Sequence, residues 1–305
     1  MMPIQTIDAE GRPSQRFFSP DMTIWRIDRE MILLLAGGRA LLMQLAHPKI
    51  AAGVAHHSRF QADPLARLQR TMGTLWSIVF DDRSSACAAL ERVKKLHGRI
   101  RGSVPHGESS YAAEIYDARD IDLLLWVHAT LIDSALAAYD LFVKPLTAQE
   151  KSLYYDDSKK LAALFEIPQT RLPPTLSEFG CYMETSLTRG GIQVGPTAKK
   201  LAEEILYLRP WFLRPAGPLL RLITEGLLPV SLRKAYGIDW NKSKDRRFRL
   251  CAKAVRFLVP VTPSWLRVAP NARRAEKALS RCLDRHGRAV RSGAPSTGDM
   301  IGRWR

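Results

Sequence analysis

The sequence lacks the closely spaced cysteines of a zinc knuckle or of a redox-active CxxC site. Its four cysteines lie far apart along 305 residues, at Cys87, Cys181, Cys251 and Cys282. This spacing favours reduced, mostly buried thiols over a zinc site or a disulfide framework. The polar N-terminal segment has no apolar signal core, and the longest apolar run, residues 31–45, is broken by glycine, arginine and glutamine. We therefore expect a cytoplasmic protein, with contact at a membrane surface left open.

Acidic residues are scarce: 30 Asp and Glu stand against 46 Lys and Arg, which gives a formal net charge of +16. Such an excess favours binding to nucleic acid, anionic lipid or acidic partners. The chain has no zinc finger, no recognisable helix-turn-helix pair and no RNA-binding signature. We therefore expect no specific nucleic-acid partner.

Strand pairs, internal repeats and sustained heptads are also absent, whereas helix signals recur along the chain. They predict helices over residues 21–46, 48–56, 63–80 and 83–102, one from Asp120 to Pro145, and further helices after the capping-box patterns at residues 147 and 175 and after residue 196. The fold class we expect is all-α. Residues 1–20 form an arm, residues 21–286 one helical domain, and residues 287–305 a basic tail.

The predicted helix over residues 83–102 carries a histidine on its apolar face. Apolar residues recur at helical spacing, and His97 falls in the same row, which comprises Ala86, Leu90, Val93, His97 and Ile100. Ser84 or Ser85 can cap the start of this helix, and Gly102 can end it. From this helix alone, a core histidine hydrogen-bonded to a neighbour is the favoured interpretation, and a metal ligand is the alternative.

The preceding helix carries Arg67, Arg70 and Thr71. Arg67 and Thr71 lie one turn apart and share a face, which the connection over residues 80–84 can bring over His97. A haem needs an imidazole for its iron, and cationic or hydroxyl groups for its propionates or for dioxygen. By spacing alone, an ordinary surface arginine and an ordinary helix threonine remain the alternatives.

Other histidines offer competing sites. His128 lies among apolar residues of the helix after Asp120, where it can be a buried structural histidine, a second haem contact or the axial ligand itself. The remaining cluster consists of His47, His56 and His57. It lacks a fourth ligand at any spacing recognised for a zinc site.

From about residue 21 to residue 286, the sequence resembles the MpaB-type oxygenase family, which includes the rubber oxygenases called latex clearing proteins. The order and spacing of several segments carry the resemblance, among them LLMQLAHPKIAAGVAHHSRF, DPLARLQRT, ERVKKLHGRIRG, LLLWVHATLIDSAL and TEGLLPVSLRKAYGIDW. The resemblance implies a globin-like helical core with one haem b. It also implies dioxygen and an apolar, isoprenoid-like substrate as reactants, with double-bond cleavage as the family's chemistry.

The resemblance places the family's haem-ligating histidine, in an Arg-Val-x-x-x-His context, on His97, and its Arg-x-x-x-Thr pattern on Arg67 and Thr71. Rubber oxygenases carry a lysine before that threonine, which can occupy the distal iron site, and this chain has Arg70. A guanidinium has no free lone pair for iron, so Arg70 can instead hydrogen-bond dioxygen or a propionate. The family's acidic base has no match that aligns, and its place can be taken by a histidine: His47, His56 or His57. For each of the three, an ordinary loop or cap histidine is the favoured interpretation.

Two further functions remain open. One alternative is a haem-free basic protein that binds a membrane surface or lipid. The Pro-, Trp- and Arg-rich region from Arg209 to Pro218, which contains Trp211 and Phe212, indicates such a function, and so do Trp265 and Leu266. The basic run Lys242, Lys244, Arg246, Arg247 and Arg249 is expected to be a solvated helix face. A haem carrier or sensor without turnover is the other alternative. The sequence does not name the substrate or the reductant.

Overall fold

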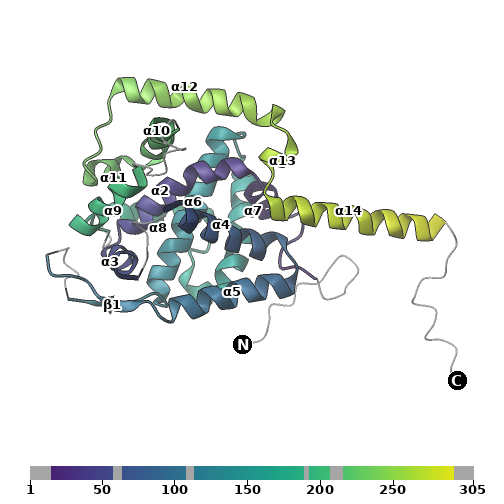
Figure 1. Cartoon of the computed structure of the whole chain (residues 1–305), viewed down its shortest axis with the longest axis horizontal. Coiled ribbons are helices and arrows are strands. Elements are labelled where there is room, and N and C mark those ends of the chain that lie inside the picture. The colour runs from purple at the N-terminus through teal and green to yellow at the C-terminus, as the bar shows by residue number, and fades with distance from the viewer. Residues whose placement is uncertain (1–14, 58–63, 108–112, 189–191, 207–215, 292–305) are drawn as a thin grey trace.

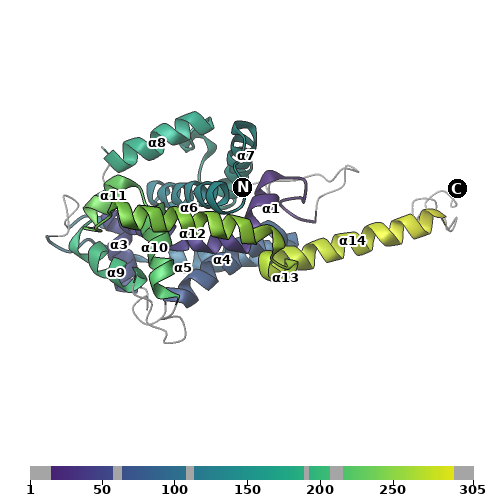
Figure 2. The same cartoon turned by 90° about the horizontal axis from the view of Figure 1, so that it is seen from above.

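The computed structural model describes residues 15–57, 64–107, 113–188, 192–206 and 216–291, without the side chains of residues 64–68 and 282–291. These parts of the chain form fourteen α-helices, three short 3-10 helices and one pair of short strands. The all-α prediction is confirmed. The helices gather around a central one, and the last helix projects away from the body (Figures 1 and 2).

The central helix is α6 (Ile121–Phe142), which packs against η1 (Met31–Ala36), α2 (Gly37–Leu45) and α7 (Ala148–Leu164). Its predicted cap is confirmed, because the Asp120 carboxylate accepts a hydrogen bond from the backbone N–H of Asp122 at 2.9 Å. Among the described helices, α6 alone is long and apolar enough to cross a membrane. The two bent helical segments at residues 31–45 and 48–57 are long and apolar enough only if they are counted as one span. In this fold, the apolar residues of α6 fill the core.

The expected single helix over residues 21–46 is wrong. The chain instead forms α1 (Thr23–Asp28), η1 and α2. Glu30 adopts an extended conformation, because its backbone pairs with Val268 and its carboxylate accepts two hydrogen bonds from Arg267, at 2.8 and 3.0 Å. This long-range clasp interrupts the helix at a position where the local sequence gives no break signal.

The glycine pair at residues 37 and 38 lies at a helix crossing. A Cβ atom at Gly38 would lie 2.9 Å from Cγ2 and 3.2 Å from Cβ of Thr224, in α10 (Gly217–Leu227). The sequence predicts a close neighbour here, either another backbone or a flat ligand. In this structure the neighbour is the side chain of Thr224.

The helices α4 (Pro64–Phe80) and α5 (Arg83–His97) form a hairpin. The cap of α5 is Asp82, whose carboxylate accepts a hydrogen bond from the N–H of Ser85 at 2.9 Å, so neither predicted serine is the cap. The helix also ends earlier than predicted, with Gly98 as its C-cap. The expected cap of α4, residue 63, lies outside the described residues.

Residues assigned to the end of that helix instead form strand β1 (Arg101–Ser103), which pairs antiparallel with β2 (Ile115–Asp117). The expectation of no strand pair is therefore wrong. Gly102 is needed because a Cβ there would lie 2.5 Å from the hydroxyl oxygen of Tyr116, the residue opposite it in the ladder. The local sequence predicted that Gly102 ends a helix. In the structure Gly102 instead makes room for Tyr116, its neighbour across the strand pair.

The remaining helices surround this core. Both predicted capping boxes are present, at the starts of α7 and α8 (Leu176–Thr188). The other elements are α3 (Pro48–His57), η2 (Gln169–Arg171), α9 (Pro196–Leu206), α11 (Val230–Ala235), α12 (Lys242–Leu258), η4 (Val259–Val261), α13 (Ser264–Arg267) and α14 (Pro270–Arg291). α14 runs across the predicted domain boundary at residue 287.

Candidate functional site

The α4–α5 hairpin carries Arg67, Arg70 and Thr71 on its first helix and His97 at the end of its second helix, whereas His128 lies on α6. At 1.5 Å per residue, Arg67 and His97 each lie about 20 Å from the turn between the two helices. Thr71 lies about 14 Å from the same turn. The side chain of Arg67 is outside the described part of the chain, so the hairpin relates its backbone position to that of His97. Arg70 and Thr71 are exposed on α4.

His97 is the last residue of α5 and is half-buried. The row of residues that contains it is buried at Ala86 and Leu90 and becomes half-exposed at Val93 and His97, because the helix leaves the core toward its C-terminus. Burial lowers the pKa of the His97 imidazole, and the Asp117 carboxylate of β2 opposes this shift. The neutral imidazole, which carries a free lone pair, is therefore favoured.

His128 lies at the centre of α6 and is only 7% exposed. Its Nε2 atom is buried without a hydrogen-bond partner among the described residues. Burial lowers the pKa of this imidazole to about 4. An unsatisfied buried polar atom costs about 1–3 kcal/mol, so an unpartnered nitrogen in a core helix is consistent with a ligand-binding role.

The three histidines considered as bases have different surroundings. His56 Nδ1 lies 2.9 Å from the Tyr116 hydroxyl, and His57 Nε2 lies 2.9 Å from the Arg101 carbonyl oxygen, so both contact the strand pair. Burial, followed by the charge of Lys49, lowers the pKa of His47 to about 4. No group of three His, Cys, Asp or Glu residues suited to a metal ion occurs among the described residues.

The expectation of mostly buried thiols is wrong for the cysteines whose side chains are described. Cys87 and Cys181 are exposed, and Cys251 is half-buried. All three are free thiols. Each lies on a helix, and the apolar neighbours in the sequence do not reveal which face of the helix is turned outward.

A cavity of about 460 Å³ lies between α6, η2 and α8, next to the turn from α2 to α3. Polar groups at this cavity include His47, the Asp122–Arg171 ion pair and Tyr182, and apolar groups include Trp126. The indole N–H of Trp126 donates to the Met43 carbonyl oxygen at 3.1 Å, which fixes this wall. No sequence motif marks Asp122, Arg171 and Tyr182, because they come from separate elements of the fold.

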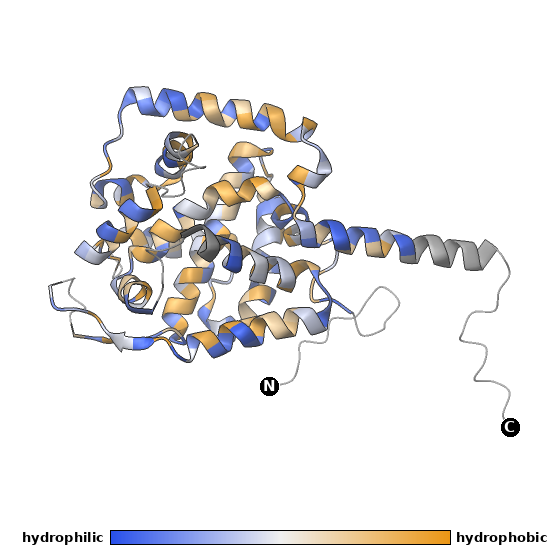
Figure 3. Cartoon of the chain, viewed as in Figure 1, coloured by the Kyte–Doolittle hydropathy of each residue, from blue (hydrophilic) through white to orange (hydrophobic). Residues whose placement is uncertain are grey.

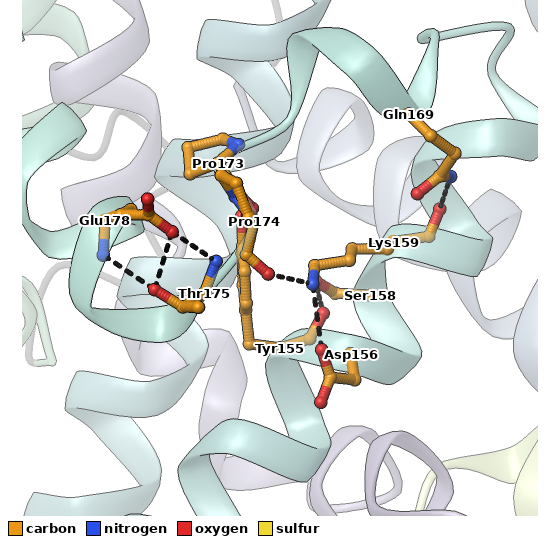
Figure 4. A network of polar contacts seen from close by, with 9 residues as sticks. All are labelled: Tyr155, Asp156, Ser158, Lys159, Gln169, Pro173, Pro174, Thr175 and Glu178. Carbon is orange, nitrogen blue, oxygen red and sulfur yellow. Dashed lines mark hydrogen bonds and ion pairs between the residues drawn. The ribbon is translucent and has the colours of Figure 1, made fainter.

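The link between α7 and α8 holds one wall of this cavity in place (Figure 4). The Tyr155 hydroxyl donates to the Pro173 carbonyl oxygen at 2.7 Å, and the Lys159 ammonium contacts Asp156 at 2.9 Å. Thr175 and Glu178 then form the capping box that starts α8. These contacts fix the direction of the helix that carries Tyr182 and Ser186.

Comparison with known proteins identifies the family of this chain. Over 237 residues, the chain is 27% identical to uncharacterized protein Rv2237 of Mycobacterium tuberculosis and to uncharacterized protein Mb2261 of Mycobacterium bovis, covering 74% of this chain and 89% of each relative. No solved structure matches. The catalytic domain described as ER-bound oxygenase mpaB/B'/rubber oxygenase matches residues 25–257, which run from within α1 almost to the end of α12. The resemblance noted in the sequence is thus confirmed, and the chain belongs to the family of MpaB-type and rubber oxygenases.

Proposed function

We propose that this protein is a haem b-dependent oxygenase that uses dioxygen to oxidise an apolar, isoprenoid- or lipid-like substrate. Family membership supports the oxygenase class. The observation that carries the cofactor assignment is the buried, unpartnered Nε2 atom of His128 inside the matched domain. His97 would hold the iron, from its position in the family pattern, and His128 would be a second haem contact.

The donor set of this chain fits a haem. Iron binds the neutral form of imidazole, and burial lowers the pKa of both His97 and His128. Arg70 is exposed on α4 and Arg67 lies on the same helix, which packs against the helix that carries His97, and guanidinium groups suit propionate carboxylates. The neutral nitrogen bases and the cations thus match the two kinds of group that a haem presents to a protein.

When bound, haem b supplies the redox chemistry that oxygen activation requires. The protein would contribute binding and positioning: His97 would hold the iron, and the guanidinium groups of Arg67 and Arg70 would bind propionates or donate hydrogen bonds to dioxygen. Because a guanidinium offers no lone pair, Arg70 would not ligate the iron. The Thr71 hydroxyl is a further donor on the same helix.

The cofactor assignment is tested by the absorption spectrum of protein expressed with iron and a haem precursor. We expect a Soret band and a pyridine haemochrome of the b type. His97→Gly should lose or shift this band, and added imidazole should restore it, because free imidazole can replace the missing ligand. His106→Gly, at an exposed position, is the matched control. Protein without a Soret band would refute the haem assignment, and an unchanged spectrum in His97→Gly would refute His97 as the ligand.

The reaction is tested separately by oxygen uptake. Reduced, haem-loaded protein is supplied with squalene, or with its saturated counterpart squalane. We expect uptake with squalene only, because cleavage of a double bond requires one. Haem-loaded protein that consumes no oxygen with unsaturated lipids would instead support a carrier or sensor.

A further inference from the structure

A group of apolar side chains lies exposed where α12 leads through η4 to α13. Phe257 is 79% exposed, Val261 72% and Trp265 62%, and Leu258 and Leu266 are also more than half exposed. Single exposed apolar residues are ordinary, but five within ten residues form a patch of the kind that marks interaction surfaces. α12 and α13 lie at one edge of the molecule (Figure 1), and α12 changes from hydrophilic to hydrophobic toward α13 (Figure 3).

The same exposed face of α12 carries a row of basic residues. Lys242, Arg246, Arg249 and Lys253 recur at spacings of three and four residues, and Phe257 continues the row one turn later. Together with Leu250 and Asp245, the four basic residues line a shallow depression of about 480 Å³. Asp245 forms an ion pair with Arg249 and is the acidic member of this lining, so the face is basic overall.

The opposite face of α12 is fixed to the body of the protein. Ala252 is buried in the main core, and the Arg256 guanidinium donates to the Leu141 carbonyl oxygen of α6 at 3.0 Å. Phe248 lies against Gly226 of α10, where an added Cβ would lie within 2.7 Å of the phenyl ring. These contacts keep the basic and apolar face turned outward.

We propose that this face binds the surface of an anionic lipid bilayer. It is defined here as the α12–α13 surface and comprises Lys242, Arg246, Arg249, Leu250, Lys253, Phe257, Leu258, Val261, Trp265 and Leu266. Exposed apolar and tryptophan side chains fit the boundary between headgroups and acyl chains, and the adjacent cations fit lipid phosphates and carboxylates. A symmetric dimer through this face would bring like charges together, which disfavours a second copy as the partner.

This assignment differs from the membrane alternative drawn from the sequence. That alternative placed the contact mainly at residues 209–218, of which residues 209–215 lie outside the described part of the chain. Trp265 and Leu266 were also named from the sequence, and both are exposed. Of the basic run predicted to be a solvated face, Lys244 is instead half-buried and pairs with Glu225 at 3.2 Å, and the other four residues are exposed. The structure joins that exposed face to Phe257, which the sequence did not mark.

Flotation with vesicles tests the proposal on the full chain. Phosphatidylcholine vesicles are compared with vesicles that also contain phosphatidylserine. We expect binding only to the anionic vesicles, and weaker binding as salt rises. Phe257→Ser combined with Trp265→Ser should weaken the partition at least about tenfold, because two large apolar side chains no longer insert. Arg246→Gln combined with Lys253→Gln should weaken it roughly fivefold per charge.

Matched controls separate this surface from the net charge of the chain. Lys199→Gln combined with Lys200→Gln removes two exposed charges on α9, and Ile115→Ser removes an exposed apolar side chain on β2. Both controls should bind nearly as wild type does, and far-ultraviolet circular dichroism checks that every variant folds. The proposal is overturned by absent binding, by equal binding to neutral vesicles, or by equal losses in the controls. It is also overturned if the Phe257/Trp265 variant loses self-association in sedimentation but retains vesicle binding.

Discussion

The crossing of α2 and α10 offers a sharp test of the packing. Gly38→Ala adds a Cβ that would lie 2.9 Å from Cγ2 and 3.2 Å from Cβ of Thr224. Rotation of the threonine side chain about χ1 does not relieve the contact, because its methyl and hydroxyl positions both face Gly38 and every rotamer leaves a heavy atom in at least one of them. The helices must therefore move apart, and overpacking of this kind costs about 1–3 kcal/mol. Alanine gains about 1 kcal/mol over glycine in helix propensity, so we expect a net loss of up to about 2 kcal/mol.

Thr224→Ala removes the methyl and hydroxyl groups that cause this clash and leaves only the Cβ at 3.2 Å, which a shift of a few tenths of an ångström accommodates. In that background, Gly38→Ala keeps its propensity gain and should stabilise the protein by about 1 kcal/mol. The coupling free energy of the double-mutant cycle is then about 1–3 kcal/mol. Urea unfolding followed by circular dichroism measures each free energy of unfolding.

Gly180→Ala is the matched control. Gly180 lies within α8, and an added Cβ there would meet no atom within 4 Å. We expect this variant to gain about 1 kcal/mol from propensity alone. A coupling energy between residues 38 and 224 below about 0.5 kcal/mol would refute the packing argument. It would also reopen the interpretation that the glycines make room for a ligand.

Three further predictions rest on named contacts. Because burial lowers the pKa of His128 from 6.5 to about 4, only the unfolded chain gains this proton as the pH falls from 6.5 to 4. The free energy of unfolding of haem-free protein should fall by about 3 kcal/mol over that range, and His128→Leu should remove this part of the pH dependence, as measured by urea unfolding at each pH. Arg39→Met should cost about 3 kcal/mol in the same assay, because the buried guanidinium contacts Asp133 at 2.5 Å and the Leu227 carbonyl oxygen at 2.9 Å; Arg39→Lys should lose less. Thr147→Ala should lower the free energy of unfolding by about 1 kcal/mol, because the Thr147 hydroxyl accepts the cap hydrogen bond. Thr147→Ser keeps a hydroxyl and should not lower it; equal losses in the two variants would contradict this role of the hydroxyl.

Local signals predicted much of the fold. Helix starts at Asp120, Thr147, Thr175 and Pro196 are all present in the structure, because caps and N-terminal prolines act through neighbours three or fewer residues away. Predictions failed where distant residues decide the conformation. Glu30 leaves the helical path because Arg267 and Val268 bind it, and Gly102 lies in a strand because Tyr116 covers it.

In the candidate site, too, local spacing predicted some features, and others depend on tertiary packing. Helical spacing placed His128 in the core, and the structure adds what no spacing reveals, namely that its Nε2 atom lacks a partner. For His97 the spacing predicted more burial than the end of α5 provides. The cavity beside Tyr182 could not be predicted, because η2, α6 and α8 meet there only through tertiary packing.

The clasp between Glu30 and the segment around Arg267 has a consequence for biosynthesis. Trp25 donates to the Glu276 carboxylate at 3.2 Å, and Ala269 and Ala272 complete the core beside the first helices. Trp25 and Glu30 therefore wait for partners that lie 251 and 237 residues further along the chain, beyond residue 257, where the family match ends. A nascent chain would carry an open hydrophobic seam until those residues emerge, which makes it a client for holding chaperones.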